Sequence, residues 1–125
     1  MGVKDGHLFP CPASPNCVSS DAPDTAHSVA PFRLIVPPTD GWRAVQAALD
    51  GLPRTKMVIA ADDYLHVECS SAVFGFVDDL ELHLRPAEKL IAVRSASRLG
   101  HSDFGVNRKR VEQLRSLLIK QGLVR

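Results

Sequence analysis

Three consecutive basic residues, Arg108, Lys109 and Arg110, fall in the first turn of a helix that the sequence predicts over residues 107–121. The amino-terminal end of a helix already carries a partial positive charge, so each cation there is unfavourable by roughly 0.3–1 kcal/mol. We therefore expect a negative group beside this turn, either an internal acid or the carboxylate or phosphate of a ligand. The internal candidates are Asp78, Asp79 and Asp103.

The segment before this helix, residues 94–107, has the composition of an anion-binding loop. It is rich in hydroxyl side chains, and Gly100 and Gly105 allow a backbone to approach a ligand closely. One interpretation is a non-catalytic site for a small anionic molecule or for the acidic segment of a partner. The residues predicted to bind the ligand are Arg94, Ser95, Ser97, Arg98, Asp103, Asn107 and Arg108, together with the acids Asp78, Asp79 and Glu81.

Acids and bases are unevenly distributed along the chain, which supports two other interpretations. Residues 50–84 hold seven acids and two bases, whereas residues 85–115 hold eight bases and three acids. If these segments form adjacent strands, an internal salt-bridge network is the simplest outcome, as in a structural or interaction module. Its pairs would be Glu81 with Arg94 and Asp79 with Arg98. Alternatively, the same four residues would serve a hydrolase or transferase, with an acid as base and the arginines stabilising developing negative charge.

Cys11 and Cys17 flank a short Pro-rich segment that has three interpretations. A disulfide, which we place first, would close a small loop and stabilise the fold by roughly 2–3 kcal/mol. A zinc half-site would need two further ligands, and His7 and His27 do not have the spacing of a common finger. A thiol nucleophile activated by His27 has no local signature.

Four residues on one face of the predicted strands have side chains that bind metals; they are His66, Glu68, Glu81 and His83. Two imidazoles and a carboxylate are able to bind zinc or iron. The alternation of a strand produces this arrangement without a metal, and the chain has no HxxxH or HxH spacing. It also has no Walker loop, dinucleotide fingerprint or Gly-x-Ser-x-Gly motif. We therefore expect no metal and no cofactor.

The apolar spacing predicts the elements that position these groups. A helix capped by Thr39 or Asp40 presents one apolar stripe and ends at Pro53. Strands follow over residues 56–61 and 64–70, and the second alternates between apolar and polar residues. Its apolar positions are Leu65, Val67 and Cys69, so we expect this cysteine in the core.

Two further strands, over residues 79–85 and 91–94, are expected to form a hairpin with a loop over residues 86–89. Matching their apolar faces fixes the register. In that register Glu81 lies opposite Arg94 on the polar face, away from the core.

The order of these elements predicts one α+β domain over residues 1–125, a four-stranded, mainly antiparallel sheet with two helices packed on one face. Seven of the nine prolines fall in the first forty residues. We therefore expect residues 1–38 to form an irregular arm that wraps around the sheet, with a short edge strand over residues 32–36. Residues 39–125 form the helix–sheet–helix core.

Net charge and hydropathy exclude several classes of function. A formal charge of +1 on 125 residues produces no field that would attract nucleic acid. No apolar run approaches the roughly 20 residues that span a bilayer. Because the first residues lack the apolar stretch of a secretory signal, we expect a cytoplasmic protein, or an exported one from which the signal has been removed. The oligomeric state is left open.

Three long blocks of sequence are unusual: PCPASPNCVSS at residues 10–20, GFVDDLE at 75–81 and RSASRLGHSDFGVNR at 94–108. They resemble the family catalogued as domain of unknown function 1499, over nearly the whole chain. The resemblance implies a small bacterial or plastid-type domain and assigns no reaction. Members often follow export or lipoprotein signals, which implies an oxidised pair at Cys11 and Cys17. We hypothesise that the three blocks converge on one polar site beside the arm.

Overall fold

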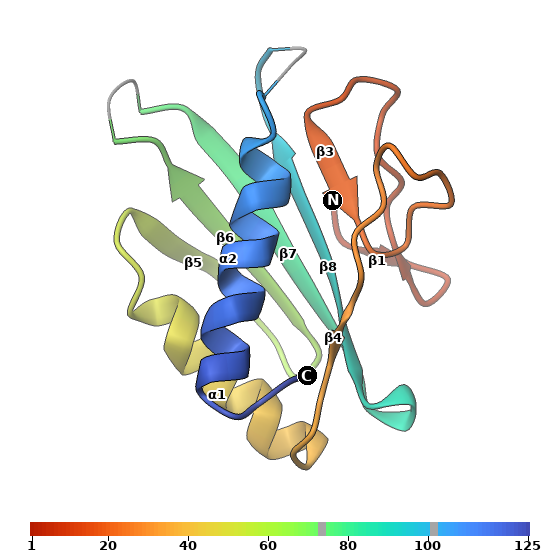
Figure 1. The fold of residues 1–125 in the computed structure, drawn as a ribbon, viewed down its shortest axis with the longest axis vertical. Coiled ribbons are helices and arrows are strands. Elements are labelled where there is room, and N and C mark those ends of the chain that lie inside the picture. The colour runs from red at the N-terminus through yellow and green to blue at the C-terminus, as the bar shows by residue number, and fades with distance from the viewer. Residues whose placement is uncertain (73–74, 101–102) are drawn as a thin grey trace.

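The computed structural model describes residues 1–72, 75–100 and 103–125. Two helices lie in a layer against one face of a twisted sheet (Figure 1). The elements in chain order are β1 (Val3–Lys4), β2 (His7–Leu8), β3 (Cys17–Ser19), β4 (Phe32–Arg33), α1 (Pro38–Asp50), β5 (Thr55–Ala60), β6 (Tyr64–Ser70), β7 (Val77–Arg85), η1 (Pro86–Glu88), β8 (Leu90–Ser97) and α2 (Val106–Lys120).

The main sheet has six strands, not the four expected, and β1 and β2 form a second, two-stranded sheet. The strand order of the main sheet is β3-β8-β7-β6-β5, and β4 also pairs with β8. All of these pairings are antiparallel. The additional strands come from the arm. The two residues of β4 lie within the edge strand expected over residues 32–36. β3, with three residues, is too short to show the alternation by which a strand is recognised.

The central hairpin has the predicted register, with Glu81 opposite Arg94 and Leu82 opposite Val93. The 3₁₀ turn η1 and Lys89, which adopts the left-handed φ of 54°, close the hairpin. The two faces of the sheet therefore carry the side chains that alternation predicts.

Both helices lie where the apolar stripes place them, but the predicted cap of the first is wrong. α1 begins at Pro38, and Pro37 occupies the cap position without any side-chain hydrogen bond. Proline suits this first helical position because the N–H that it lacks would have no partner in the helix. Within the described ranges, no helix combines the length and the apolar character needed to cross a membrane.

The core lies between the two helices and one face of the sheet. Its central residues are Val45 and Leu49 from α1, Val111, Leu114 and Leu118 from α2, and Leu65, Val67, Leu80, Leu82, Ile91 and Val93 from the sheet. Cys69 is buried in the same cluster, as its position in the alternation predicts.

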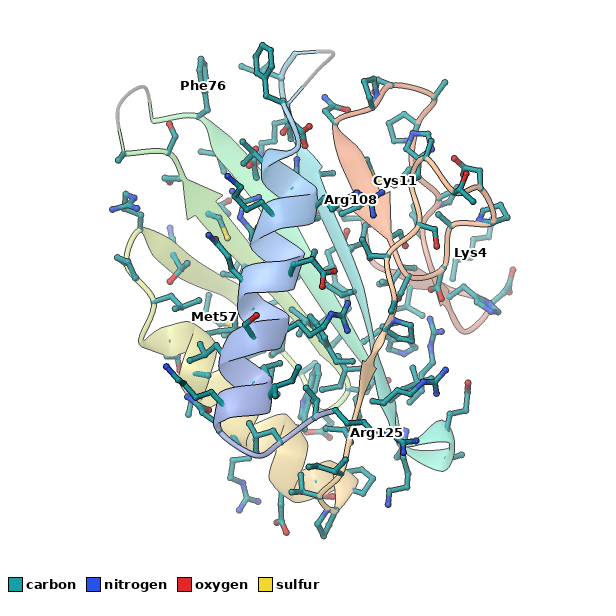
Figure 2. All side chains as sticks on the ribbon, viewed as in Figure 1. Lys4, Cys11, Met57, Phe76, Arg108 and Arg125 are labelled. Carbon is teal, nitrogen blue, oxygen red and sulfur yellow. A yellow bond between two sulfur atoms is a disulfide. The ribbon has the colours of Figure 1, made fainter. Side chains whose placement is uncertain are left out.

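The arm covers the opposite, polar face of the sheet. Leu8 of β2 packs against Leu90 and Ala92 of β8, with Tyr64 at the edge of this small cluster. Figure 2 shows the arm with Lys4 and Cys11 on the side of β8 away from β5. The charged groups on this face are therefore largely removed from water.

Candidate functional site

Glu81 is a charged residue with no exposed surface, beneath the arm. Its Oε1 accepts hydrogen bonds from the Tyr64 hydroxyl at 2.7 Å and from the Gly2 backbone N–H at 2.8 Å. Its Oε2 accepts one from Arg94 at 3.1 Å, and Arg94 also donates to the Pro10 carbonyl. Burial and the contact with Glu81 raise the pKa of Tyr64. Both carboxylate oxygens are thus engaged within the fold.

Asp79 forms a second network on the same face. Arg98 donates to Asp79 through Nε and Nη2, both at 2.9 Å, and to Glu68 at 2.6 Å. His66 Nε2 lies 2.7 Å from Asp79 Oδ1. Burial raises the pKa of Asp79, but the hydrogen bonds from Arg98 and His66 outweigh it, so the pKa lies below its usual value. The predicted pairs, Glu81 with Arg94 and Asp79 with Arg98, are confirmed.

A separate polar group lies on the helix side of the sheet, around the buried Asn107. The Asn107 side chain bonds to Ser95, Ser97, Asp103, Arg110 and the carbonyl of Asn16. Asp103 also accepts from the backbone N–H groups of Gly105 and Asn107. Burial raises the pKa of Asp103, and these bonds lower it below its usual value. Asp103 is therefore one of the negative groups expected at the start of this helix.

The three cations of the first helical turn have different surroundings. Arg110 forms an ion pair with Asp78 at 2.8 Å. Arg108 donates to the carbonyls of Ala26 and Ser28 in the arm, so its charge is hydrogen-bonded but not neutralised. Among the ion pairs of the described residues, none involves Lys109.

The residues predicted to form one site are therefore divided between two faces of the sheet. One group is Asp79, Glu81, Arg94 and Arg98; the other is Asp78, Ser95, Ser97, Asp103, Asn107 and Arg108. The strands alternate, so neighbours such as Asp78 and Asp79 point in opposite directions. The contacts of Arg94 and Arg98 favour an internal network over direct ligand binding.

Cys11 and Cys17 form a disulfide. It joins the start of β3 to the segment whose Pro10 carbonyl accepts a hydrogen bond from Arg94. Within the described residues, no group of three or more metal-binding side chains is found.

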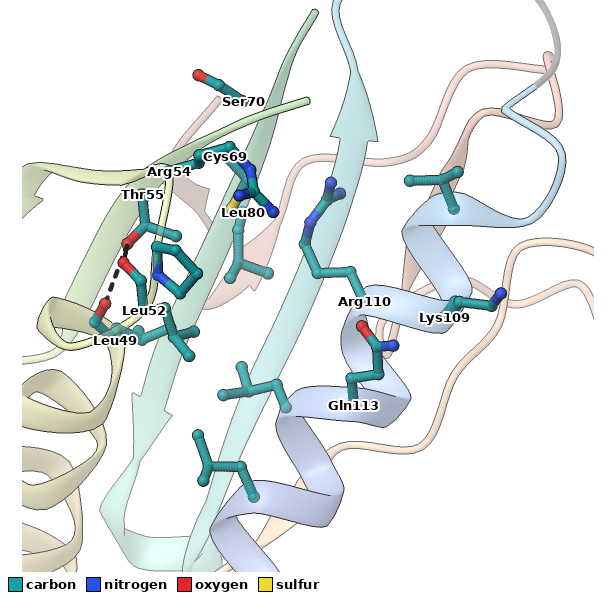
Figure 3. Close-up of a pocket in the computed structure, with 14 residues that line it drawn as sticks. Leu49, Leu52, Arg54, Thr55, Cys69, Ser70, Leu80, Lys109, Arg110 and Gln113 are labelled. Atoms are coloured by element: carbon teal, nitrogen blue, oxygen red, sulfur yellow. Dashed lines mark hydrogen bonds between the residues drawn. The ribbon is translucent and has the colours of Figure 1, made fainter. Parts of the chain in front are cut away.

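Sequence reasoning did not find a groove between the end of α1 and α2 (Figure 3). Its volume is about 450 Å³. Leu49, Leu52, Leu80, Leu114 and Leu117 are among its apolar lining residues. The one signal in the sequence is that Leu52 and Leu117 extend the two helical stripes; the structure leaves both only partly buried.

Basic side chains border this groove. Figure 3 shows Arg54, from the turn before β5, and Arg110, from α2, approaching the same end of the groove. Lys109 lies at the next helical position, and the fourteen residues that line the groove include no acid. Cys69 lies in the lining, where burial raises the pKa of its thiol. A neutral thiol is a poor nucleophile.

A sequence model of the family described as "Protein of unknown function (DUF1499)" matches residues 7–118. The chain belongs to this family. The match runs from β2 into α2 and so includes the residues that line the groove and, apart from Gly2, both networks. It confirms the resemblance of the three sequence blocks, and DUF1499 carries no assigned activity. No curated protein and no solved structure matches this DUF1499 chain.

Proposed function

We propose that this domain is a non-catalytic binding protein for a small anionic amphiphile, a molecule with a negatively charged head group and an apolar chain. The observation that carries the proposal is the groove of about 450 Å³, whose lining combines leucines with three cations and no acid. Its volume lies within the roughly 300–1,000 Å³ that is typical of ligand sites.

The two parts of the ligand correspond to two parts of the groove. The leucines of α1, β7 and α2 offer the chain an apolar surface, and burial there is worth roughly 25 cal/mol per Å². Arg54 has no ion pair among the described residues and so offers an uncompensated charge to the head group. The ion pair with Asp78 holds Arg110 in place beside the head group.

The residues first considered as ligand-binding take supporting roles in this proposal. Arg94 and Arg98 hold the sheet and the arm together through Glu81 and Asp79. Asn107 joins α2 to β8 through Ser95, which sets the angle at which the helix borders the groove. Asp79 and Glu81 are engaged in these contacts, which argues against the alternative in which either is a catalytic base.

The disulfide bears on where this binding takes place. Disulfides persist in oxidising compartments and are rare in the cytosol. The Cys11–Cys17 bond therefore supports an exported domain over the cytoplasmic location expected from the first residues.

Calorimetric titration with decanoate tests the proposal, with decanol and inorganic phosphate as probes for the chain and for the head group alone. We expect saturable decanoate binding below its micelle concentration and at least tenfold weaker binding of both other probes, since each lacks one part of the interaction. Arg54→Gln should weaken decanoate binding by about tenfold, because it removes the uncompensated charge.

A variant that fills the groove provides the decisive comparison. Gln113 lines the groove and is exposed, so Gln113→Trp should abolish decanoate binding without disturbing the core. Ser116→Trp, at an exposed position of the same helix outside the lining, is the matched control. Decanoate binding by Gln113→Trp at the wild-type affinity would overturn the proposal, as would the absence of binding by the wild-type protein.

A further inference from the structure

Four large apolar side chains are exposed at one end of the molecule: Phe76, Leu99, Phe104 and Val106. Phe76 belongs to the β6–β7 connection, Leu99 and Phe104 belong to the β8–α2 connection, and Val106 is the first residue of α2. The two connections lie at the same end of the sheet (Figure 1). The strand pairing requires this, because Ser70 pairs with Val77 and the Arg98 N–H donates to the Val77 carbonyl. We call this set of four residues the loop end.

Two of these side chains are strongly exposed. Leu99 is 76% exposed and Phe104 is 97% exposed. Phe104 also has a φ of 53°, in the left-handed region, where a bulky side chain is disfavoured and glycine or asparagine is preferred. Both its exposure and its backbone therefore favour a small or polar residue at a position that holds a phenylalanine.

Cations border the loop end, and the nearby acids are engaged within the fold. The Arg54 carbonyl accepts the Ser70 N–H, which places Arg54 at this end of the sheet, and Arg108 and Lys109 follow Val106 on α2. Asp78 is paired with Arg110, Glu68 and Asp79 with Arg98, and Asp103 is bonded to the start of α2. None of the ion pairs among the described residues involves Arg54, Arg108 or Lys109. These three cations are therefore not paired with an internal acid in the part of the chain that the structure describes.

We propose that the loop end docks the domain on the surface of a lipid bilayer that contains anionic lipids. Apolar side chains on the two connections enter the interfacial region, and Arg54, Arg108 and Lys109 face the lipid head groups. A bilayer fits this surface better than a protein partner. Stable protein interfaces bury roughly 800 Å² on each side, whereas this surface has four exposed apolar side chains beside three cations without an internal ion pair in the described ranges.

Docking at the loop end would also bring the groove to the membrane, because Val106 belongs to both. The two proposals also share Arg54 and Lys109, but Leu99 and Phe104 lie outside the groove lining and belong to the docking proposal alone. An experiment on these two residues therefore tests docking separately from ligand binding.

Sedimentation with vesicles tests docking, using vesicles of phosphatidylcholine alone and of phosphatidylcholine and phosphatidylglycerol in equal parts. We expect the wild-type protein to bind the mixed vesicles and to bind the neutral ones more weakly. Leu99→Ser/Phe104→Ser should lower the partition coefficient by about tenfold for each side chain. Ile119→Ser is the control, since Ile119 is also apolar and is 48% exposed but lies near the other end of α2.

Decanoate is then titrated into the same variants in the absence of vesicles, which measures ligand binding separately from docking. Loss of vesicle binding by Leu99→Ser/Phe104→Ser with decanoate affinity retained would support docking by the loop end, whereas failure of the groove proposal would appear as loss of decanoate binding in the wild type. Vesicle binding unchanged in the double variant, or absent in the wild type, would overturn the docking proposal. A dimeric wild-type protein and a monomeric double variant would also overturn the docking proposal, because the loop end would then be an interface between copies of the chain.

Discussion

Glu81 and Arg94 form an ion pair that is nearly excluded from water, and such a pair is a weak source of net stability. Removing two charges from water costs about as much as their attraction returns, but removing only one leaves the other charge uncompensated. The additional donors, Tyr64 and the Gly2 N–H, offset part of the cost because they complete the carboxylate's hydrogen bonds. The pair therefore selects the register and the position of the arm more than it adds stability.

A double-mutant cycle measures this balance. Glu81→Leu alone should lower the free energy of unfolding by about 3–5 kcal/mol, because Arg94 remains buried without its acid. Glu81→Leu/Arg94→Met should recover most of that loss, since an apolar pair of similar volume replaces the ion pair. Urea unfolding of the four proteins provides the measurement. A double variant no more stable than Glu81→Leu would contradict the interpretation.

The carboxylates paired with arginine make stability depend on pH. The pKa of Asp79 and that of Asp21, which Arg85 contacts, are both held below the usual value of 3.8, although burial alone would raise them. The unfolded chain therefore binds more protons than the folded one as the pH falls through this value, so stability is present above it and lost below. Thermal unfolding should show the melting temperature falling steeply below about pH 4.

Asp79→Asn identifies the source of this effect. It should lower stability at neutral pH by about 2 kcal/mol, because a charged hydrogen-bond acceptor is lost, and should reduce the slope of melting temperature against pH. Asp62→Asn, in an exposed turn, should leave the slope unchanged. Equal slopes in wild type and Asp79→Asn would place the acid sensitivity elsewhere.

The arm shows how short elements depend on their neighbours. β3 has three residues, and it pairs with Ser95 and its neighbours in β8 while the disulfide begins at its first residue. A strand of this length does not persist alone. Its position rests on the sheet, on the covalent bond and on the Arg108 contacts with the arm.

Cys11→Ser/Cys17→Ser tests the covalent contribution. Opening this small loop should lower the free energy of unfolding by about 2 kcal/mol, through the entropy of the unfolded chain. Cys69→Ser is not a suitable control, because Cys69 is in the core. The stability of the double variant is instead compared with that of the wild-type protein under oxidising and reducing conditions. Alkylation followed by mass measurement should find one reactive thiol in the unfolded oxidised protein and three in the reduced one. Equal stability of the oxidised and reduced proteins would contradict a structural role.

The molecule as a whole has two polar regions separated by the sheet. The arm covers one face, where Glu81 and Asp79 lie, and the helices border the groove on the other. The sheet lies between them, so changes under the arm should not be transmitted to the groove except through loss of folding.

Deletion of residues 1–9 tests this separation. The deletion removes Leu8 from its apolar cluster and the Gly2 N–H from Glu81, so it should lower the free energy of unfolding by about 3 kcal/mol. Because the groove lies on the other face, the shortened protein should bind decanoate with wild-type affinity at a temperature where it remains folded. A large loss of affinity in a protein shown by circular dichroism to be folded would mean that the two faces are coupled.

Local patterns were sufficient to predict the central strands, both helices and the position of Glu81 opposite Arg94. The direction of side chains repeats with a fixed period in a strand and in a helix, and this period does not depend on distant segments. β4 falls within the edge strand expected over residues 32–36, whereas β3 was missed because it becomes a strand only by pairing with β8. The division of the candidate residues between two faces, the burial of Glu81 by Gly2 and the groove between α1 and α2 all arise from contacts between segments far apart in the chain. Such contacts depend on how the elements pack, and packing is decided by the shapes of whole surfaces, which no residue spacing encodes.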